Sequence, residues 1–190
     1  MEAALEEMPL ELINISDLAK RAGKSVGSFY TKFRDKEELL DAVLRRYEDE
    51  RASMEDSMFL PGKWVGVTLA ERVRGVVAAT VEEYRTRRGL FLAYQARARL
   101  RPFGASSDEI ERLKPLYDAI ADLLAECRDE IVHDDAERAS RFAFFMLTSL
   151  CSSAILHSAD AHSITISLND DELGRRCVDA MLSYLAGAAR

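Results

Sequence analysis

A single glycine between two short amphipathic segments is the feature that most restricts how this chain can fold. Gly23 follows residues 17–22, which span about one and a half helical turns and are apolar on one side. Ser16 is the expected N-cap of that helix, and Ser25 is expected to cap a second helix that ends near Phe33. Glycine suits the position after a helix end, because a left-handed backbone there is costly for any residue with a side chain. Two short helices joined by such a turn predict a helix-turn-helix, whose second helix enters the major groove of DNA.

The second of these helices has two different sides when its residues are placed at about 100° intervals. Apolar and aromatic side chains that suit a core fall on one side, namely Val26, Phe29, Tyr30 and Phe33. Small, polar or basic residues that suit a groove-facing surface fall on the other, namely Gly27, Ser28, Thr31 and Lys32. Glycine inside a helix costs roughly 1 kcal/mol relative to alanine, so Gly27 needs a reason. Close approach of the backbone to DNA and close packing on a neighbouring helix are both open explanations.

Charge is distributed unevenly along the 190 residues. The net charge of −7 argues against a generally basic nucleic-acid-binding protein. Residues 16–36 nevertheless contain six basic and two acidic side chains: Lys20, Arg21, Lys24, Lys32, Arg34 and Lys36 against Asp17 and Asp35. This local positive excess suits phosphate contact by a protein whose acidic remainder stays off the DNA. A solvated charged face is the alternative interpretation of the same residues.

The same region resembles a known DNA-binding signature. The run Ala22-Gly23-x-Ser25-x-Gly27-Ser28-Phe29-Tyr30-x-x-Phe33-x-x-Lys36-Glu37-x-Leu39 is similar to that of the TetR (tetracycline-repressor-like) family of bacterial transcription regulators. The resemblance implies an all-α fold, with a three-helix head that carries the helix-turn-helix and a larger helical body for ligand binding and dimerisation. It also implies that residues 25–33 are the recognition helix.

The resemblance assigns DNA contacts residue by residue. Base edges would be contacted by Val26, Gly27, Ser28, Thr31 and Lys32. Phosphates would be contacted by Ser16, Lys24, Ser25, Tyr30 and Lys36. Lys24 departs from the family pattern, which usually has an apolar residue there, so its side chain must snorkel or point at a phosphate. The family also has a longer first helix and lead-in than residues 1–15 provide, so either the start is shortened or residues precede it.

The remainder of the chain is expected to be helical. Residues 1–47 are assigned to the DNA-binding domain and residues 48–190 to the ligand-binding and dimerisation domain. Helices are expected from Asp35 to about Met54, from Thr68 to about Arg87, over 90–100, from Ser106 to about Val132, from Asp134 or Asp135 to about His157, and after Asn169. The pairs Thr68–Glu71, Ser106–Glu109 and Asn169–Glu172 have the spacing of capping boxes. No segment has a strand pattern long enough to count, so the predicted fold class is all-α.

The helix expected near residues 135–157 is apolar on almost every side, which predicts burial on almost every side. One small subunit can hardly supply that burial, so a partner subunit is expected. In the resembled family, the last two helices of each subunit form a four-helix bundle in a homodimer. The interface residues expected on this basis are Leu150, Ala154, Leu173, Cys177, Ala180, Met181 and Tyr184.

The resemblance further implies a pocket for a small-molecule effector inside the body. The residues expected to line it are Tyr94, Tyr117, Phe142, Phe145, Met146 and Ser149, although each also suits an ordinary core. A pocket of this composition would be largely apolar and aromatic, and it would favour a hydrophobic or aromatic effector. Effector binding would shift the two heads and weaken operator binding, with a coupling that is reciprocal between the two sites.

Signatures of catalysis, metal binding and export were sought as well. The chain has no GxSxG, P-loop, GxGxxG or HExxH motif, and its three cysteines form no CxxC pair. His157, His162, Asp160 and Cys151 are near one another in sequence but match no known ligand spacing. We therefore expect no enzyme and no cofactor. The acidic N-terminus lacks a signal-peptide pattern, and the apolar run Phe142–Leu150 is too short to span a bilayer, so a cytoplasmic protein without membrane contact is expected.

Three functional hypotheses follow. The leading one is a ligand-responsive transcriptional regulator, expected to be a repressor, that binds a palindromic operator in double-stranded DNA as a homodimer. The second is a protein on the same scaffold that sequesters a ligand or a partner without binding DNA, which Lys24 and the short lead-in leave open. The third is an enzyme of unrecognised type. Salt-dependent DNA affinity separates the first from the second, and turnover that depends on His157 would support the third.

Overall fold

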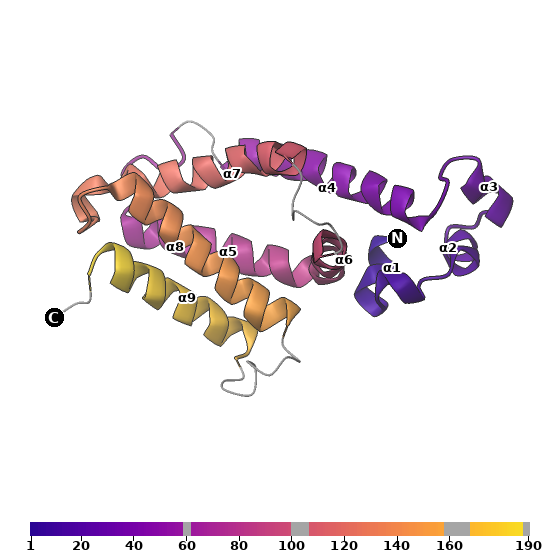
Figure 1. Ribbon diagram of the computed structural model, residues 1–190. Helices are drawn as coiled ribbons and strands as arrows, with labels where there is room; N and C mark the ends of the chain where they lie inside the picture. Colours follow the sequence, from indigo (N-terminus) through magenta and orange to yellow (C-terminus); the bar gives the residue numbers. More distant parts are fainter. Residues whose placement is uncertain (59–61, 100–106, 158–167, 188–190) are drawn as a thin grey trace. The chain divides into compact units, whose positions relative to one another are not determined.

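The computed structural model describes residues 1–58, 62–99, 107–157 and 168–187, and this part of the chain consists of helices and turns without a strand (Figure 1). The all-α prediction is therefore confirmed. The chain divides into two compact units. We call Met1–Leu60 with Arg87–Gly104 the head unit, and Pro61–Thr86 with Ala105–Arg190 the body unit. The expected domain boundary at residue 47 stays a prediction, and the helix at that point continues to Met58.

The head unit contains five α-helices and one short 3-10 turn in its described part. They are α1 (Glu2–Glu7), η1 (Leu10–Leu12), α2 (Ile15–Arg21), α3 (Val26–Tyr30), α4 (Lys36–Met58) and α6 (Arg88–Arg99). Their shared core consists of Ala4, Leu5, Leu10, Ile13, Leu18, Leu40, Tyr47, Leu90 and Ala93. The core draws on every helix of the unit except α3, so α3 projects from a scaffold that the other helices form.

Gly89 lets α1 and α6 pack closely. A Cβ atom at this position would stand 2.2 Å from the carbonyl oxygen of Leu5, which no side chain tolerates. The Gly89 amide also donates a hydrogen bond of 2.9 Å to the Glu6 carboxylate. The helices expected to about Arg87 and over 90–100 would leave Gly89 between them. Instead α5 ends at Thr86, and Gly89 lies inside α6, where its role is close backbone approach.

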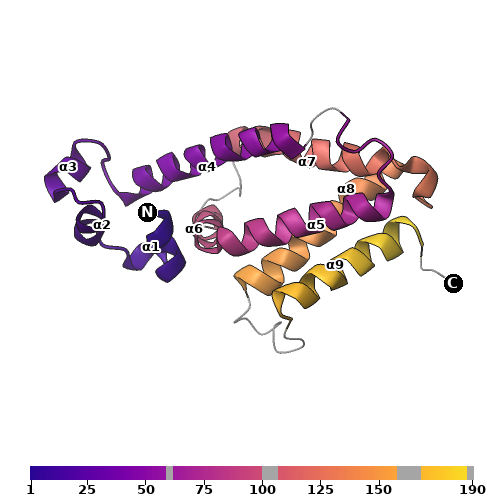
Figure 2. The same cartoon turned by 180° about the vertical axis from the view of Figure 1, so that it is seen from behind.

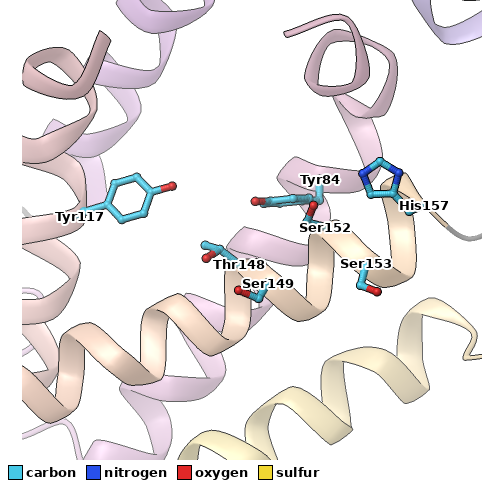
Figure 3. Close-up of a pocket in the computed structure, with 7 residues that line it drawn as sticks. All are labelled: Tyr84, Tyr117, Thr148, Ser149, Ser152, Ser153 and His157. Atoms are coloured by element: carbon cyan, nitrogen blue, oxygen red, sulfur yellow. The ribbon is translucent and has the colours of Figure 1, made fainter. Parts of the chain in front are cut away.

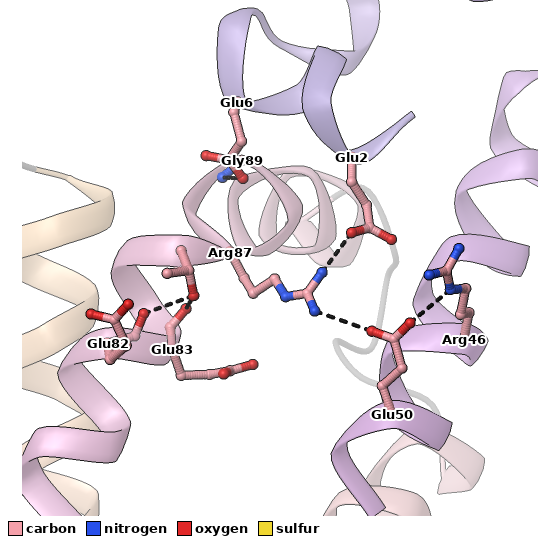
Figure 4. A network of polar contacts seen from close by, with 9 residues as sticks. Glu2, Glu6, Arg46, Glu50, Glu82, Glu83, Arg87 and Gly89 are labelled. Atoms are coloured by element: carbon pink, nitrogen blue, oxygen red, sulfur yellow. Dashed lines mark hydrogen bonds and ion pairs between the residues drawn. The ribbon is translucent and has the colours of Figure 1, made fainter. Parts of the chain in front are cut away.

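A polar network adds to this packing (Figure 4). The Arg87 guanidinium donates to Glu2 at 2.5 Å and to Glu50 at 3.1 Å, and Arg46 donates to Glu50 at 2.7 Å. These contacts join α1, α4 and the start of α6 within the head unit. Because the Arg87 side chain is about three-quarters buried, its ion pairs are shielded better than ordinary surface pairs.

The body unit is built around α8. Its elements are α5 (Leu69–Thr86), α7 (Ser107–Ala125), η2 (Arg128–Glu130), α8 (Ala136–Cys151), η3 (Ser152–Leu156) and α9 (Asp170–Leu185). α8 packs against α5, α7 and α9, and it runs beside α9 in both views (Figure 1 and Figure 2). Small or apolar residues such as Ala143, Leu147 and Cys177 are completely buried at these contacts.

Side-chain caps explain most of the helix starts. Thr68 and Glu71 exchange the two capping-box hydrogen bonds, and Asp35 and Asn169 cap α4 and α9 as expected. Of the two candidates for α8, the residue that caps it is Asp135. Ser106 lies outside the described residues.

Several predicted helix ends were wrong. Asn14 caps α2 by accepting from the Ser16 amide at 2.8 Å, so the expected cap residue lies inside the helix. α4 extends to Met58 rather than to about Met54. α7 ends at Ala125 instead of near Val132, because the following chain turns through η2 and the Val132 amide then donates to the Leu185 carbonyl at 2.8 Å. This last contact is tertiary and has no local sequence signal.

Among the described residues, one helical stretch, Ala136–Leu156, is long and apolar enough to cross a bilayer by length and composition alone. It contains the shorter apolar run Phe142–Leu150, which by itself is too short to span a bilayer. A core helix of a soluble protein passes the same test, and α8 buries seven of its side chains against the other helices of the body unit. The stretch is therefore weak evidence for a membrane span.

Candidate functional site

The turn between α2 and α3 has the geometry that the sequence predicted. Gly23 has a left-handed backbone with φ 63°. Its amide donates to the Lys20 carbonyl at 3.0 Å, and the Lys24 amide donates to the Ala19 carbonyl at 2.8 Å. This pair of bonds is a Schellman motif, which ends a helix and reverses the chain direction. The Ser25 side chain then accepts from the Ser28 amide at 3.1 Å and starts α3.

α3 is shorter and more exposed than predicted. It ends at Tyr30 rather than near Phe33, and Phe29 is its one buried residue. The predicted core side was wrong for two residues, since Val26 is 41% exposed and Tyr30 is 56% exposed. A helix of five residues rests on the scaffold mainly through Phe29, which leaves the rest of its surface open.

The outward surface of α3 contains the residues expected to meet bases. Val26, Gly27, Thr31 and Lys32 are exposed, and Ser28 is half-buried. A Cβ atom on Gly27 would meet only the Ser25 hydroxyl, at 3.7 Å, so close packing on a neighbouring helix does not explain this glycine. The Thr31 hydroxyl donates to the Ser28 carbonyl at 2.8 Å, which orients it at the end of the helix.

Apart from Lys36, the basic residues of segment 16–36 form two groups. Arg21 is paired with Glu7, and Arg34 is paired with Asp35. The hydrogen bond from Arg21 lowers the pKa of Glu7 and raises that of the guanidinium. Lys20, Lys24 and Lys32 instead present exposed side chains on α2, on the turn and after α3. The positive surface available to a phosphate is thus concentrated around the turn and α3.

The Lys36 side chain is hydrogen-bonded to the protein itself rather than left open to a phosphate. Its half-buried ammonium donates to the carbonyls of Leu10, Glu11 and Ile13 at 2.8, 2.9 and 3.4 Å. These bonds use all three donors of the group and attach η1 to the start of α4. Nothing local in the sequence indicates this role, because the partners are more than twenty residues away. The phosphate contact of Lys36 stays a prediction. Ser16 is exposed and donates to Asn14 at 2.9 Å.

A second candidate site is a pocket of about 450 Å³ in the body unit (Figure 3). Its described lining residues come from α5, α7, α8 and η3 and from the residue after η3: Tyr84, Tyr117, Thr148, Ser149, Ser152, Ser153 and His157. Burial raises the pKa of Tyr84, and the neighbouring Tyr117 and Cys151 add to this shift. Each lining side chain carries a hydroxyl or an imidazole, whereas a largely apolar and aromatic lining was expected for an effector pocket, and that expectation stays a prediction.

The residues expected to line an effector pocket are only partly brought together. Tyr117 and Ser149 line the pocket described above. Phe142 and Phe145 are exposed. The Phe142 ring packs on the Tyr184 ring instead, with 5.2 Å between the ring centroids. Met146 is half-buried on α8, and Tyr94 belongs to the head unit. The sequence missed Tyr84 and His157, because their contribution depends on how three helices pack.

Of the residues expected at a dimer interface, some are buried within the subunit and others are exposed. Leu173, Cys177 and Met181 are buried in the core of the body unit, so their side chains are not available to a partner. Leu150 and Ala180 are exposed, and Ala154 and Tyr184 are half-buried. α8 is therefore not surrounded on all sides within one subunit, since Phe142, Phe145 and Leu150 remain large exposed apolar side chains.

No cluster of metal-ligating side chains occurs within the described ranges. Asp160 and His162 lie outside them, so the sequence cluster near His157 is not described as a whole.

The sequence was compared with known proteins. The family model for bacterial regulatory proteins, tetR family, matches residues 2–43. The match runs from the start of α1 into α4 and includes the entire helix-turn-helix. No curated protein matches the sequence.

Proposed function

We propose that this chain, which the match over residues 2–43 classifies with the bacterial regulatory proteins of the tetR family, is a homodimeric repressor whose operator binding responds to a small molecule. The family itself establishes the coarser statement, a DNA-binding transcriptional regulator with a helix-turn-helix. Repression, dimerisation and the effector are the parts that we add.

The observation that carries the proposal is the open surface of α3 beside a rigid turn. The Schellman turn at Gly23 sets the direction of α3, and Phe29 anchors it. Thr31 and Lys32 are then exposed and suited to base edges, while the methyl groups of Val26 suit a thymine methyl. Ser16, Lys24, Ser25, Tyr30 and Lys36 are the proposed phosphate contacts, which position the protein without specifying a sequence.

Dimerisation is supported by the exposed apolar residues of α8. Phe145 is 61% exposed, and Phe142 and Leu150 are also exposed on the same helix. Exposed aromatic side chains grouped in this way are typical of protein–protein contacts. Ala180 on the adjacent α9 is small and exposed, which suits close approach of a second copy. A two-fold dimer would present two α3 helices to successive major grooves of a palindrome.

The effector role is supported by the pocket and by the chain that follows it. Tyr84 lines the pocket near the end of α5, and Arg87 lies three residues later in the sequence. Arg87 joins α1 to α4 in the head unit through Glu2 and Glu50. A ligand that shifted α5 would therefore act on a residue that holds the head together. Coupling of this kind is reciprocal, so DNA must weaken ligand binding by the same factor.

Selection of bound sequences from a random duplex pool, at about physiological salt, tests the proposal. An enriched palindrome is expected, and Thr31→Ala should change the preferred bases. Lys32→Ala should weaken binding, whereas Lys114→Ala removes an exposed lysine from α7 and serves as the matched control. A folded dimer that enriches no sequence would contradict the proposal and would favour the alternative, a ligand-sequestering protein that does not bind DNA.

A further inference from the structure

The Thr31 side chain lies at the end of α3, and its hydroxyl proton is already in use. The hydroxyl donates to the Ser28 carbonyl at 2.8 Å. Chemistry fixes the direction of this bond, because a carbonyl oxygen can only accept. A hydroxyl has one proton and two lone pairs, so Thr31 retains only its capacity to accept. Because the side chain is exposed, that capacity is available to a partner outside the protein.

The backbone beside Thr31 keeps the hydroxyl in this role. In a regular α-helix the Lys32 amide would donate to the Ser28 carbonyl, four residues earlier. Here the amides of Lys32 and Phe33 both donate to the Phe29 carbonyl, at 2.9 and 3.0 Å. The Ser28 carbonyl accepts from the Thr31 hydroxyl instead. A hydroxyl that turned away to donate to DNA would break this bond, so accepting is favoured over donating.

Gly27 leaves the approach to the Thr31 hydroxyl open. Thr31 keeps helical backbone angles, with φ −73° and ψ −19°. Residues four apart share a helix face, so a side chain at position 27 would stand beside Thr31. A Cβ atom there would meet only the Ser25 hydroxyl, at 3.7 Å, so packing inside the head unit does not require a glycine. The open space over Gly27 gives a base edge access to Thr31.

The four bases differ in what they present to such an acceptor in the major groove. Adenine and cytosine each present an amino group, which donates. Guanine and thymine present carbonyl oxygens, which accept. An acceptor placed against these oxygens forms no hydrogen bond and faces a partial charge of the same sign. A hydroxyl whose proton stays on Ser28 therefore distinguishes amino bases from keto bases, although it does not distinguish adenine from cytosine.

We propose that Thr31, reached over Gly27, accepts a hydrogen bond from the amino group of adenine or cytosine and so selects an amino base at one position in each half of the operator. This inference rests on the proposed function, in which α3 is the recognition helix, and it adds the chemical class of the base. The neighbouring Lys32 has the opposite polarity, because an ammonium only donates and suits guanine or thymine.

Selection from a random duplex pool, with the full chain and with its Thr31→Val variant, tests the inference. Valine has nearly the shape of threonine and lacks the hydroxyl. The unchanged protein is expected to enrich adenine or cytosine at one position per half-site, and the variant should lose that preference alone. Guanine or thymine at the position that responds to the substitution would overturn the inference. A variant that enriches the same sequences as the unchanged protein would overturn it as well.

Removal of the amino group from the DNA probes the same bond from the other side. Purine replaces adenine, or pyrimidin-2-one replaces cytosine, at the selected position of the operator. This change is expected to weaken binding of the unchanged protein about fivefold and to leave the Thr31→Val protein unaffected. An equal loss in both proteins would mean that the amino group acts through the duplex rather than through Thr31, and the inference would be overturned.

Gly27→Ala tests the access to Thr31 without removing a hydrogen bond. Alanine favours a helix more than glycine does, so urea unfolding should show equal or higher stability. The added methyl group stands beside Thr31 and should weaken operator binding at least about fivefold. A variant of normal stability that binds the operator as tightly as the unchanged protein would overturn the proposed approach over Gly27.

Two further variants separate base contact from the loss of an intrahelical bond. The exposed Thr86 hydroxyl donates to the Glu82 carbonyl at 2.8 Å at the end of α5, so Thr86→Val removes the same kind of bond from the body unit. This control should enrich the same sequences as the unchanged protein. Thr31→Ser restores the hydroxyl and should recover the preference for an amino base. Failure of Thr31→Ser to recover it, in a folded protein, would contradict the role of the hydroxyl.

The outcomes separate this inference from the proposed function. A folded protein that enriches no sequence contradicts both. Enrichment of a palindrome that does not respond to any Thr31 substitution contradicts this inference and still supports the proposed function.

Discussion

α2 and α8 both leave regular α-helical geometry next to a candidate site, but they do so by different means. α2 ends where Gly23 takes a left-handed backbone, and nothing lies within 4 Å of the position that a Cβ atom would occupy. α8 widens into η3, where the sequence SSAIL contains neither glycine nor proline. Leu156, the last residue of this wider turn, and Cys151, the residue that precedes it, are buried.

The comparison separates a local cause from a tertiary one. The turn before α3 depends on the backbone energy of one residue, so its sequence signal is strong. The wide turn beside the pocket depends on the packing of its neighbours, so no single residue type specifies it. Substitutions at the turn before α3 should therefore change the backbone contribution to the free energy of unfolding. Substitutions at the wide turn should change the packing contribution.

Replacing Leu156 by alanine tests the tertiary cause and should have the largest effect. The side chain is 3% exposed, so its truncation leaves a cavity and should lower the free energy of unfolding by about 3 kcal/mol. Urea unfolding provides the measurement. Leu12→Ala, at a position that is 70% exposed, is the control and should change stability by less than about 0.5 kcal/mol. Unchanged stability of the Leu156 variant would show that packing does not hold the wide turn.

Lys36→Ala sharpens the division between structural and DNA-contacting residues in the head. It removes three bonds to backbone carbonyls and should lower the free energy of unfolding by about 2 kcal/mol. A phosphate contact would in addition reduce the slope of log affinity against log salt by about one. Lys24→Ala is the matched variant, since its exposed side chain is also a proposed phosphate contact and should affect the salt slope but not stability. A Lys36 variant of normal stability would contradict the structural role.

Gly23→Ala tests the local cause. The added methyl group meets no atom within 4 Å, so the expected loss of about 1 to 2 kcal/mol comes from the left-handed backbone alone. Gly174 on α9 is equally open and lacks a positive φ, so Gly174→Ala should instead stabilise by about 0.5 kcal/mol. Urea unfolding compares the two. Equal effects of the same sign would mean that backbone conformation does not determine the turn.

The Glu7–Arg21 pair should have the smallest effect, because both side chains are about half exposed. The pKa of Glu7 is lowered in the folded protein, so its stabilisation is present above the unfolded pKa and is lost as the pH falls through the folded value. The difference in free energy of unfolding between Glu7→Gln and the unchanged protein should therefore be larger at neutral pH than at about pH 3. An equal difference at both pH values would exclude the ion pair as its cause.

Residues with local partners were predicted well. The caps at Asp35, Thr68 and Asn169 each bond to an amide three residues or fewer away, and spacing alone reveals them. The Ser16 cap was wrong because Asn14 offers a similar side-chain oxygen two residues earlier. Competition between two polar residues two positions apart depends on how the chain enters the helix, which the sequence pattern does not contain.

Residues with distant partners were predicted less well. Phe142 and Phe145 looked like pocket residues because both are aromatic and lie on a central helix, yet they are exposed. Leu173 and Met181 looked like interface residues because they share a helix face, yet that face is buried within the body unit. Periodicity shows which side of a helix is apolar, but it does not show which neighbour covers that side.

The sequence by itself determined the all-α class, the helix-turn-helix and the family of the head, because capping, a left-handed glycine and apolar periodicity are properties of adjacent residues. The tertiary structure alone decided the anchoring of Lys36, the close approach of Gly89 to Leu5, and the polar lining around Tyr84 and His157. Each of these joins atoms from segments that are distant in sequence or depends on a helix turn stabilised by its surroundings. Their formation requires the whole unit to fold, so no short window of residues contains the information.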